Sequence, residues 1–519
     1  MTAIQIAQET PLWLLLALQI AMGGFDVIVH HEITERLAWK PNAAQELRLH
    51  SARNALYALL FGGLAWLRPT GLLAAALMAV LLIEIVITLW DFVEEDQTRK
   101  LPPTERVLHT LMAINYGAIC AYTLPLLAAW AFEPTALAWI NYGIGSLVLS
   151  IAGIGCLGFA LRDIYTSRRA ARLAERAPPR VDVLFPGRKR VLITGATGFI
   201  GARLTASLIA SGHEVIALVR SPARAGTLTA PVMLVTSLRQ IPADMPVDAV
   251  VHLAGEPVAN WIWTRRRRYK IARSRLAIAR DIEAFIAQRP QSLRPATVVT
   301  ASAIGFYGDR GEESLSEADG PGKCFAARSC VAVERRATGI RSLGVRTVSL
   351  RIGLVLSVWG GPLARMVPPF DLGLGGRMGT GRQWMSWIGR DDLVRLIAHV
   401  LACRDLDGAV NATAPSPIRN AEFAMALAKA LHRPAIIPVP DALLRYGLGE
   451  MGTSLLLSSA RVMPVKILAS GFTFETPALE TLLQAEFGSI VPDHNPVPDP
   501  ALVATSSLYR PYAHGPKSV

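Results

Sequence analysis

Three glycines with the spacing Gly195-x-x-Gly198-x-x-Gly201 follow the β-prone run 190–194 and precede a helical pattern. A turn of this kind leaves the first helical N–H groups free, and the positive end of the helix dipole lies behind them. Gly195 would allow the tight turn, Gly198 a close approach of phosphates, and Gly201 close packing of helix on strand. The spacing therefore predicts a pyrophosphate-binding turn. The alternative is a glycine-rich turn without a ligand, which a second β-prone run at 214–219 disfavours.

A second set of residues that could do chemistry lies before residue 165, where carboxylates and histidines recur at helical spacing. They come from four expected helices and fall at the same end of those helices. Such groups could ligate one or two iron, manganese or zinc ions. The candidate ligands are His31, Glu35, Glu46, His50, Glu84, Asp91, Glu105 and His109.

The spacing within these pairs leaves a second interpretation open. It is Glu-x-x-x-His here, whereas di-iron sites in helix bundles use Glu-x-x-His. Ionisable groups close to lipid are costly unless they are paired or functional, so a network of salt bridges is the alternative to a metal site. The arginines that would complete the network are Arg36, Arg48, Arg53, Arg99 and Arg106.

The elements that must position these groups differ between the two ends of the chain. The 519 residues suffice for two or three domains, and 51% of them are hydrophobic, with a mean hydropathy of +0.34. A soluble enzyme is rarely so apolar, and the excess lies before about residue 165. We therefore expect an N-terminal transmembrane helical domain, 1–165. Its five expected spans are 11–30, 50–67, 70–90, 107–132 and 137–161.

Charge decides the expected orientation of these spans. Basic residues follow the first, third and fifth spans, whereas the region before the first span and the loop 133–136 hold none. Basic loops stay on the cytoplasmic side, so we expect an integral protein of the inner (cytoplasmic) membrane with its C-terminal domain in the cytoplasm. The net charge of +13 then fits contact with anionic membrane lipids. No nucleic-acid recognition motif accompanies the charge, so no nucleic-acid partner is expected.

The remainder of the chain alternates β-prone and helical patterns. A basic, proline-containing linker is expected at 166–187, and an α/β domain with a Rossmann-like, doubly wound parallel sheet at 188–487. A smaller substrate-side lobe would begin near residue 420. The segment 488–519 is rich in proline and polar residues, which is typical of a disordered tail. The five cysteines show no CxxC spacing, so neither a disulfide framework nor a cysteine zinc site is expected.

Several ordered motifs in 190–487 resemble the extended short-chain dehydrogenases/reductases. More narrowly, they resemble the NAD-dependent epimerase/dehydratase-like subfamily that carries a C-terminal domain of unknown function. The stretches that carry the resemblance include Thr194-Gly-Ala-Thr-Gly-Phe-Ile-Gly201, His252-Leu-Ala-Gly255, Ser274-Arg275, Ser302-Ala-Ile-Gly-Phe-Tyr-Gly308, Arg351-Ile-Gly-Leu-Val-Leu356, Asp391-Asp392-Leu and Leu448-Gly-Glu-Met451.

The resemblance implies a dinucleotide site. Its implied contacts are Gly195, Thr197, Gly198, Phe199, Ile200 and Gly201 in the turn, and Leu253, Ala254 and Gly255 after the fourth strand. Arg220 ends the second strand, where an NAD-selective site would place an acid. A guanidinium there can pair with a 2′-phosphate, so NADP(H) is expected in preference to NAD(H). The alternative is that Arg220 is an exposed arginine at a strand end.

The catalytic pair of the wider family is missing. That family uses Tyr-x-x-x-Lys to exchange a proton during hydride transfer, and the resemblance puts Ala326 and Cys330 at these positions. The narrower subfamily also tends to lack the pair. Ser302 and Tyr307 are the substitute catalytic candidates, although Ser302 could equally cap its strand and Tyr307 could equally be a packing residue.

Together these features predict a membrane-anchored, NADP(H)-binding oxidoreductase or epimerase-like enzyme that acts near the cytoplasmic membrane surface. Its substrate would be a small molecule, lipid-like or anionic, and the basic run 265–270 could hold an anion. The alternative is a non-catalytic NADP(H)-sensing or scaffold membrane protein, which the missing pair supports.

Overall fold

The computed structural model describes residues 3–98, 101–174, 176–221, 225, 228, 231–260 and 262–488. It divides the chain into two compact units, Met1–Arg176 (unit 1) and Ala177–Val519 (unit 2). Arg99 lies outside the described residues, as does the predicted tail apart from Gly488.

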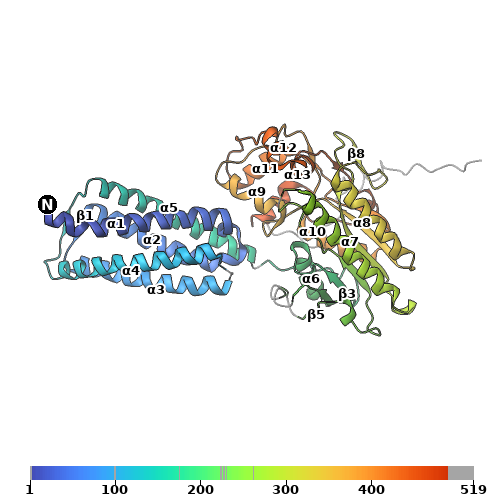
Figure 1. Cartoon of the computed structure of the whole chain (residues 1–519), viewed down its shortest axis with the longest axis horizontal. Coiled ribbons are helices and arrows are strands. Elements are labelled where there is room, and N and C mark those ends of the chain that lie inside the picture. The colour runs from blue at the N-terminus through green and yellow to red at the C-terminus, as the bar shows by residue number, and fades with distance from the viewer. Residues whose placement is uncertain are drawn as a thin grey trace, which may run out of the picture. The chain divides into compact units, whose positions relative to one another are not determined.

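The described part of unit 1 is a bundle of five long helices that lie alongside one another (Figure 1). They are α1 (Ala3–Phe25), α2 (Ala44–Trp66), α3 (Leu72–Thr98), α4 (Pro103–Ala131) and α5 (Ile144–Ala174). At one end of the bundle, α1 continues into a π-helix, η1 (Asp26–Glu35), and two single 3-10 turns, η2 (Leu37–Trp39) and η3 (Pro41–Ala43). At the other end, β1 (Leu67–Pro69) pairs antiparallel with β2 (Leu137–Trp139) and closes the loops.

Helix α3 of unit 1 has buried carboxylates on one face and exposed apolar side chains on the other. On α3 the side chains of Glu84, Asp91 and Glu95 are buried, whereas Val86 and Val93 on the opposite face are 63% and 55% exposed. Residues three and four positions apart share a helix face, so this division follows from the sequence periodicity. The pattern is the reverse of a water-soluble bundle.

Four helices among the described residues are long and apolar enough to cross a membrane, whereas the sequence analysis expects five spans. The four are Pro11–Trp39, Leu72–Thr98, Pro103–Ala131 and Ile144–Arg172. The exception is α2, because Glu46, Arg48, His50 and Arg53 in its first half lower its hydropathy.

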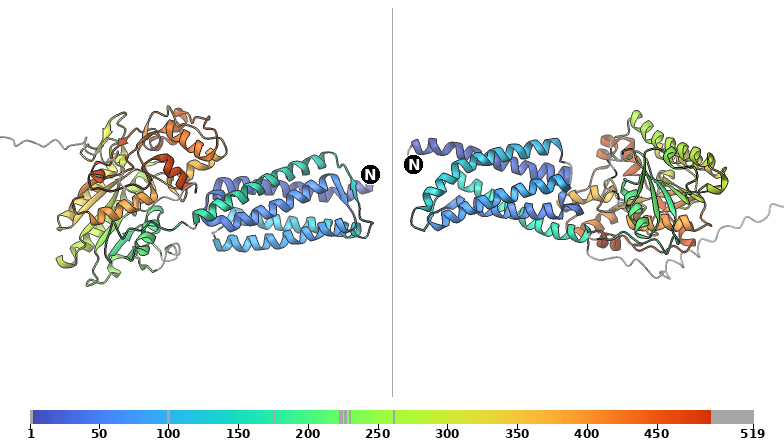
Figure 2. Two further views of the ribbon diagram at one scale, coloured as in Figure 1. Left: turned by 180° about the vertical axis from the view of Figure 1, so that it is seen from behind. Right: turned by 90° about the horizontal axis from the view of Figure 1, so that it is seen from below.

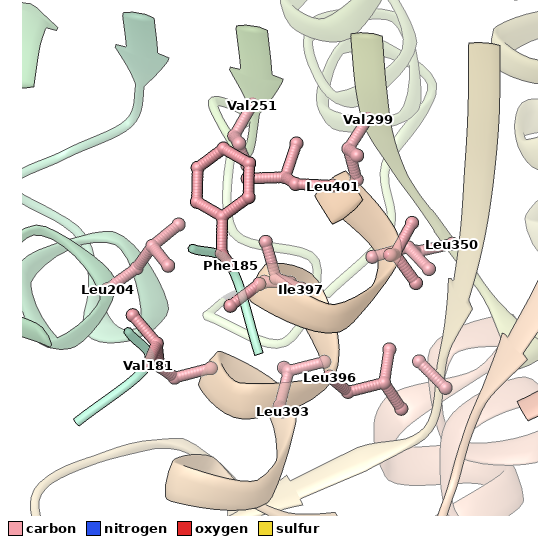
Figure 3. Close-up of a cluster of buried hydrophobic side chains, with 14 of the residues drawn as sticks. Val181, Phe185, Leu204, Val251, Val299, Leu350, Leu393, Leu396, Ile397 and Leu401 are labelled. Carbon is pink, nitrogen blue, oxygen red and sulfur yellow. The ribbon is translucent and has the colours of Figure 1, made fainter. Parts of the chain in front are cut away.

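The expected linker 166–187 is shorter in the structure. Helix α5 runs without a break to Ala174, and the arginines after residue 166 continue its helical pattern. At the other end of the expected linker, Val181 and Phe185 are buried in the core of unit 2, where they pack near α10 (Figure 3). Both ends therefore belong to folded structure.

Unit 2 is built on a parallel sheet of seven strands among its described residues. They are β3 (Arg190–Thr194), β4 (Glu214–Leu218), β5 (Met233–Val235), β6 (Ala249–His252), β7 (Thr297–Ala303), β9 (Arg346–Ile352) and β13 (Gly408–Ala412). Their order is β13-β9-β7-β6-β3-β4-β5, with every pair parallel. The chain winds in one direction from β3 to β5 and then in the other from β6 to β13, which confirms the predicted doubly wound sheet (Figure 2).

Helices cover both faces of this sheet. On β3, Val191 and Ile193 belong to the core shared with α6 (Phe199–Ala210) and α10 (Arg390–Ala402), whereas Leu192 belongs to the core on the other face. That second core is covered by α7 (Arg265–Ala287) and α8 (Phe325–Arg341). Strands buried on both faces are apolar at successive positions, which is why their sequences read as continuous hydrophobic runs.

A smaller lobe follows the sheet. It contains α11 (Asn420–Leu431), α12 (Asp441–Leu448), α13 (Glu450–Leu455), α14 (Val465–Ala469) and α15 (Leu479–Glu486). Asp392, in the first turn of α10, holds this lobe to the sheet: its carboxylate accepts hydrogen bonds from the N–H groups of Glu475 and Thr476 at 2.8 and 2.9 Å, and from the Thr476 hydroxyl at 2.7 Å. Arg395 pairs with the same carboxylate at 3.1 Å.

Because Asp392 is buried with a charged partner, its removal should be strongly destabilising. We expect Asp392→Ala to lower the free energy of unfolding of a fragment that starts at Ala177 by about 3 kcal/mol or more, since Arg395 and two backbone donors lose their acceptor. Urea unfolding followed by circular dichroism measures this change. Asp405→Ala, at an exposed position after α10, is the control and should change the free energy by less than about 0.5 kcal/mol. Equal effects of the two substitutions would contradict the role given to Asp392.

Candidate cofactor and substrate site

The glycine turn has the close approaches that its sequence predicts. Gly195 has a φ of +79°, and a Cβ on it would lie 2.8 Å from the backbone N of Ala254. A Cβ on Gly201 would lie 2.1 Å from the carbonyl oxygen of Gly195. Gly198 is the N-cap of α6 and is exposed, as is Thr197. The turn therefore presents the N-terminal N–H groups of a twelve-residue helix to solvent, which is where a pyrophosphate binds.

The loop after β6 lies beside this turn. The N–H of Leu253 donates to the Thr194 carbonyl at 3.0 Å, and His252 Nδ1 lies 2.7 Å from the Thr194 hydroxyl. The predicted residues Leu253, Ala254 and Gly255 are thus brought to the carboxyl end of the sheet between β3 and β6. The winding direction reverses at this point, and open α/β sheets bind their ligands there.

Three further predicted contacts flank the turn. Phe199 and Ile200 are half-buried in the first turn of α6, and the Phe199 ring packs against Gly360 and Gly361. Arg220 is exposed two residues beyond β4, the strand next to β3. Its guanidinium is therefore available at the side of the site where a ribose attached to the pyrophosphate would lie.

The positions of the missing catalytic pair face the end of β7. A Cβ on Gly305 would lie 3.2 Å from the Cβ of Ala326, and Cys330 Sγ lies 3.6 Å from the Ala303 carbonyl oxygen. Burial raises the pKa of the Cys330 thiol. A methyl group and a protonated thiol therefore stand where the wider family has a phenol and an ammonium group.

Ser302 lies at the expected strand end, but its hydroxyl is already engaged. It donates to Glu334 Oε1 at 2.8 Å, and Glu334 in turn pairs with Arg351 at 3.0 Å. The predicted role of Ser302 as a proton donor would require this hydroxyl to exchange partners.

Tyr307, the other predicted proton donor, is fully buried. Its hydroxyl lies 2.7 Å from Asn411 Oδ1 and 2.8 Å from the Ser316 carbonyl, and it accepts from Arg351 Nη1 at 2.9 Å. Burial raises the pKa of Tyr307 to about 12. The geometry is that of a packing residue, the alternative that the sequence analysis left open, and it joins β9, β13 and the segment after β7.

The sequence analysis gave no role to Arg275, which the structure places in this site. Its guanidinium lies against Gly255: a Cβ there would be 2.9 Å from Arg275 Nε. Arg275 Nη1 donates to the Ile271 carbonyl at 3.1 Å, and the guanidinium interacts electrostatically with Cys330 and Glu256. Burial lowers the pKa of Arg275, but an arginine remains cationic in proteins. A half-buried cation from α7 thus stands between the cofactor loop and the position of the missing pair.

The basic run 265–270 begins α7 and is partly paired. Arg267 contacts Glu256 at 2.6 Å and Arg268 contacts Glu450 at 2.5 Å. Arg265 and Arg266 are exposed. The run therefore includes both ion pairs within the fold and a solvated face.

In unit 1 the structure separates the eight predicted metal ligands into two sets. His31, His50, Glu105 and His109 gather at one end of the bundle, together with Asp26 and Glu95, which were not predicted as ligands. Glu35 pairs instead with Lys40, Glu84 accepts from the Tyr57 hydroxyl at 2.5 Å, and Asp91 accepts from Arg53 at 2.6 Å. Glu46 is buried one turn before His50 and belongs to neither potential metal group. Salt bridges and a metal-capable cluster therefore coexist.

The sheet order, the glycine turn and the loop after β6 together define an NAD(P)-binding domain of the extended short-chain dehydrogenase/reductase class. The family model "NAD dependent epimerase/dehydratase family" matches residues 191–412, and "Domain of unknown function (DUF1731)" matches 439–486. This chain belongs to the NAD dependent epimerase/dehydratase family and carries the C-terminal domain of unknown function.

Individual relatives support this assignment. An epimerase family protein of Mycobacterium bovis is 37% identical over 286 residues, which is 55% of this chain and 93% of that protein. Epimerase family protein YfhF of Bacillus subtilis is 32% identical over 296 residues, 56% of this chain and 96% of that protein. The crystal structure of human epimerase family protein SDR39U1 with NADPH superposes with a TM-score of 0.52 at 31% identity and covers 58% of this chain and 100% of that one. That human chain forms this fold as a separate chain, since it is matched over its whole length.

Acid should destabilise unit 2 through His252. Burial lowers the pKa of this imidazole from 6.5 to about 4, so the unfolded chain takes up a proton in this range before the folded one does. The contribution of His252 to stability is full above pH 6.5 and is lost as the pH falls toward 4, amounting to about 2 kcal/mol between pH 7 and pH 5.

Urea unfolding of the fragment from Ala177 at these two pH values measures the slope. His252→Gln should remove that part of the pH dependence, whereas His432→Asn, at an exposed position with a φ of +55°, should leave it unchanged. An unaltered slope in the His252 variant would show that other groups carry the pH dependence.

Proposed function

We propose that this protein is a membrane-anchored, NADP(H)-dependent oxidoreductase or epimerase-like enzyme whose substrate is a small anionic molecule, lipid-like or free. The observation that carries the proposal is the glycine turn at the switch point of the sheet, with a cationic side chain on either side of it: Arg220 beyond β4, and Arg275 between Gly255 and Cys330.

The residues of the site fit a dinucleotide. Gly195, Gly198 and Gly201 leave the N-terminus of α6 accessible to a pyrophosphate, and side chains at Gly195 or Gly201 would collide with the neighbouring backbone. The preference for NADP(H) is supported by Arg220, which can pair with a 2′-phosphate, and by the human relative, whose structure contains NADPH. A nicotinamide bound here supplies or accepts a hydride.

The chain's own contribution to chemistry centres on Arg275. A guanidinium binds a carboxylate or phosphate through paired hydrogen bonds, so the half-buried Arg275 would hold an anionic substrate beside Gly255 and keep its orientation fixed. In the wider family the lysine of the missing pair provides a cation close to this position. Arg275 supplies a cation from α7 instead, while Ala326 and Cys330 leave room for the substrate.

Membrane anchoring is supported by unit 1. Valine, leucine and isoleucine side chains face outward along α3, α4 and α5, whereas carboxylates face inward. Lipid tails are a suitable surrounding for such an outer surface, and buried ionisable groups are tolerated there when they face the bundle interior. The basic loops would place unit 2 on the cytoplasmic side.

A second candidate function is a sensor that binds NADP(H) without turnover. One observation favours it: the hydroxyl groups of both Ser302 and Tyr307 are engaged inside the fold. The two candidates differ in whether any substrate exchanges a hydride with the bound cofactor.

Arg220 should decide the choice of cofactor. We expect Arg220→Ala to weaken NADPH binding by about tenfold or more, through loss of a charge-assisted contact with the 2′-phosphate, and to leave NADH binding nearly unchanged. Calorimetric titration of the full chain in detergent with each cofactor measures both constants. Arg280→Ala, at an exposed position on α7, is the control. Equal loss for the two cofactors would exclude a 2′-phosphate contact, and binding of neither by the unaltered chain would remove the proposed function.

Arg275 should be required for turnover but not for cofactor binding. NADPH oxidation at 340 nm is followed with the anionic and the neutral fraction of a cell extract that includes lipids. The unaltered chain should turn over with the anionic fraction only, and Arg275→Met should lower this rate by about a hundredfold, while NADPH affinity changes less than about twofold.

Arg266→Met, at an exposed position on the same helix, is the matched control and should retain the rate. Tight NADPH binding without turnover in any fraction would exclude an oxidoreductase that consumes NADPH.

A further inference from the structure

We propose that unit 1 holds a metal site of one or two divalent first-row transition ions, iron or manganese, between η1, α2, α3 and α4. The proposed ligands are Asp26, His31, His50, Glu95, Glu105 and His109. This inference concerns a part of the chain outside the residues that match the epimerase/dehydratase family, and it does not depend on the proposed activity of unit 2.

The π-helix η1 brings the first ligands together. Its hydrogen bonds span five residues instead of four, so Asp26 and His31 lie on one face. His31 Nε2 lies 3.3 Å from Asp26 Oδ2, and His30 Nδ1 contacts the other oxygen of the same carboxylate at 2.8 Å. Asp26 is thus hydrogen-bonded to His30 and faces His31. A ten-residue π-helix is rare, and π-helical turns inside α-helices occur frequently at functional sites.

The first group of ligands has the spacing of atoms bound to one ion. Besides its contact with His31, Asp26 Oδ2 lies 3.1 Å from His109 Nε2, and Glu105 Oε1 lies 3.8 Å from His31 Nε2. Two ligands that each lie about 2.1 Å from an ion are separated by about 3.0–3.4 Å in tetrahedral or octahedral geometry. Small side-chain movements would therefore suffice to place Asp26, His31, Glu105 and His109 around a cation.

A second group adjoins the first. His31, His50 and Glu95 offer atoms that all lie within 4.8 Å of one another, and the rings of His31 and His50 stack with their centroids 4.6 Å apart. Glu95 links the groups, because its Oε2 lies 3.3 Å from His109 Nδ1 and its Oε1 lies 3.7 Å from His50 Nε2. Di-iron and di-manganese bundles also combine Glu and His side chains from facing helices, although with the spacing Glu-x-x-His.

His50 is buried, at 5% exposure, and carboxylate oxygens of Asp91 and Glu95 lie 3.2 and 3.7 Å from its Nε2. An imidazole nitrogen that faces carboxylate oxygens inside the bundle offers the donor types that a transition-metal ion binds. Asp26, His31 and His50 also line a cavity of about 280 Å³ within unit 1, large enough for water or a small substrate at an open coordination position.

The ligand types decide the class of metal. Three imidazoles and three carboxylates, without a cysteine, suit iron or manganese better than copper or a structural zinc ion. The alternative is that protonated histidines alone balance the carboxylates. That alternative needs no ion and makes the cluster an electrostatic network.

Metal analysis of the full chain, purified in detergent from cells supplied with iron, manganese and zinc, tests the proposal. We expect about one or two ions of iron or manganese per chain. After removal of metal with a chelator, titration with Co²⁺ should produce visible absorption bands, and X-ray absorption should show only nitrogen and oxygen ligands. Less than about a fifth of an equivalent of metal, together with no Co²⁺ bands, would overturn the proposal in favour of the electrostatic network.

Variants connect the metal to these residues. Asp26→Asn and His109→Gln should each lower metal affinity about tenfold or more, with far-UV circular dichroism and elution in detergent unchanged. The matched control is Glu35→Gln: Glu35 lies on the same π-helix and has the right chemistry, but it pairs with Lys40 outside the cluster. Metal retained in both ligand variants, or lost equally in the control, would overturn the assignment. Since the Co²⁺ and X-ray experiments use the unaltered chain, a variant that fails to fold leaves the test intact.

Discussion

The contact between Gly195 and the loop after β6 is the constraint on which the architecture of unit 2 depends. The Gly195 backbone lies so close to Leu253 and Ala254 that no side chain fits, and the α6 residue Gly201 lies equally close to Gly195. These approaches bring the ends of β3 and β6 together with the start of α6. Everything proposed for the cofactor follows from that geometry, since the helix dipole and the free N–H groups act only over a few ångströms. The wider fold keeps the turn in place by burying both faces of the sheet.

Arg275 and the positions of the missing catalytic pair lie at the same space, at the end of β7. Because Ala326 and Cys330 stand at the tyrosine and lysine positions, the space at the end of β7 is less polar than in the wider family. Arg275 of α7 supplies a cation to this space. Ser302, Glu334, Arg351 and Tyr307 form a connected hydrogen-bonded group behind that space. Their hydrogen bonds connect the ends of β7 and β9 with α8 and the segment after β7. A buried network of this kind is fully partnered, which is the condition under which polar groups can be buried without loss of stability.

The fold of unit 2 was predictable from the sequence, because strand and helix periodicities and ordered motifs are local signals. What the sequence could not show depends on three-dimensional packing. Tyr307 is an ordinary catalytic candidate by type, and only its burial against Asn411 and Arg351 gives it a structural role. Arg275 stands next to Gly255 because of the way α7 packs, although the two are twenty positions apart. The exact end of α5 within the expected linker was not predictable, because the arginines after residue 166 fit both a helix and an extended connector.

The metal cluster shows a different limit. An analysis that assumes 3.6 residues per turn pairs His31 with Glu35, whereas the π-helix pairs His31 with Asp26. A π-helical segment can also adopt the ordinary α-helix. In that form each later side chain would be turned about the helix axis relative to its present direction. Whether the side chains of this segment hold an ion would then favour either the π-helix or the α-helix. The occupancy of the cluster and the rotation of the segment that follows α1 would therefore be linked. Binding inside the bundle, at the end of the first helix, would thereby change the angular position of the surface around residues 36–43.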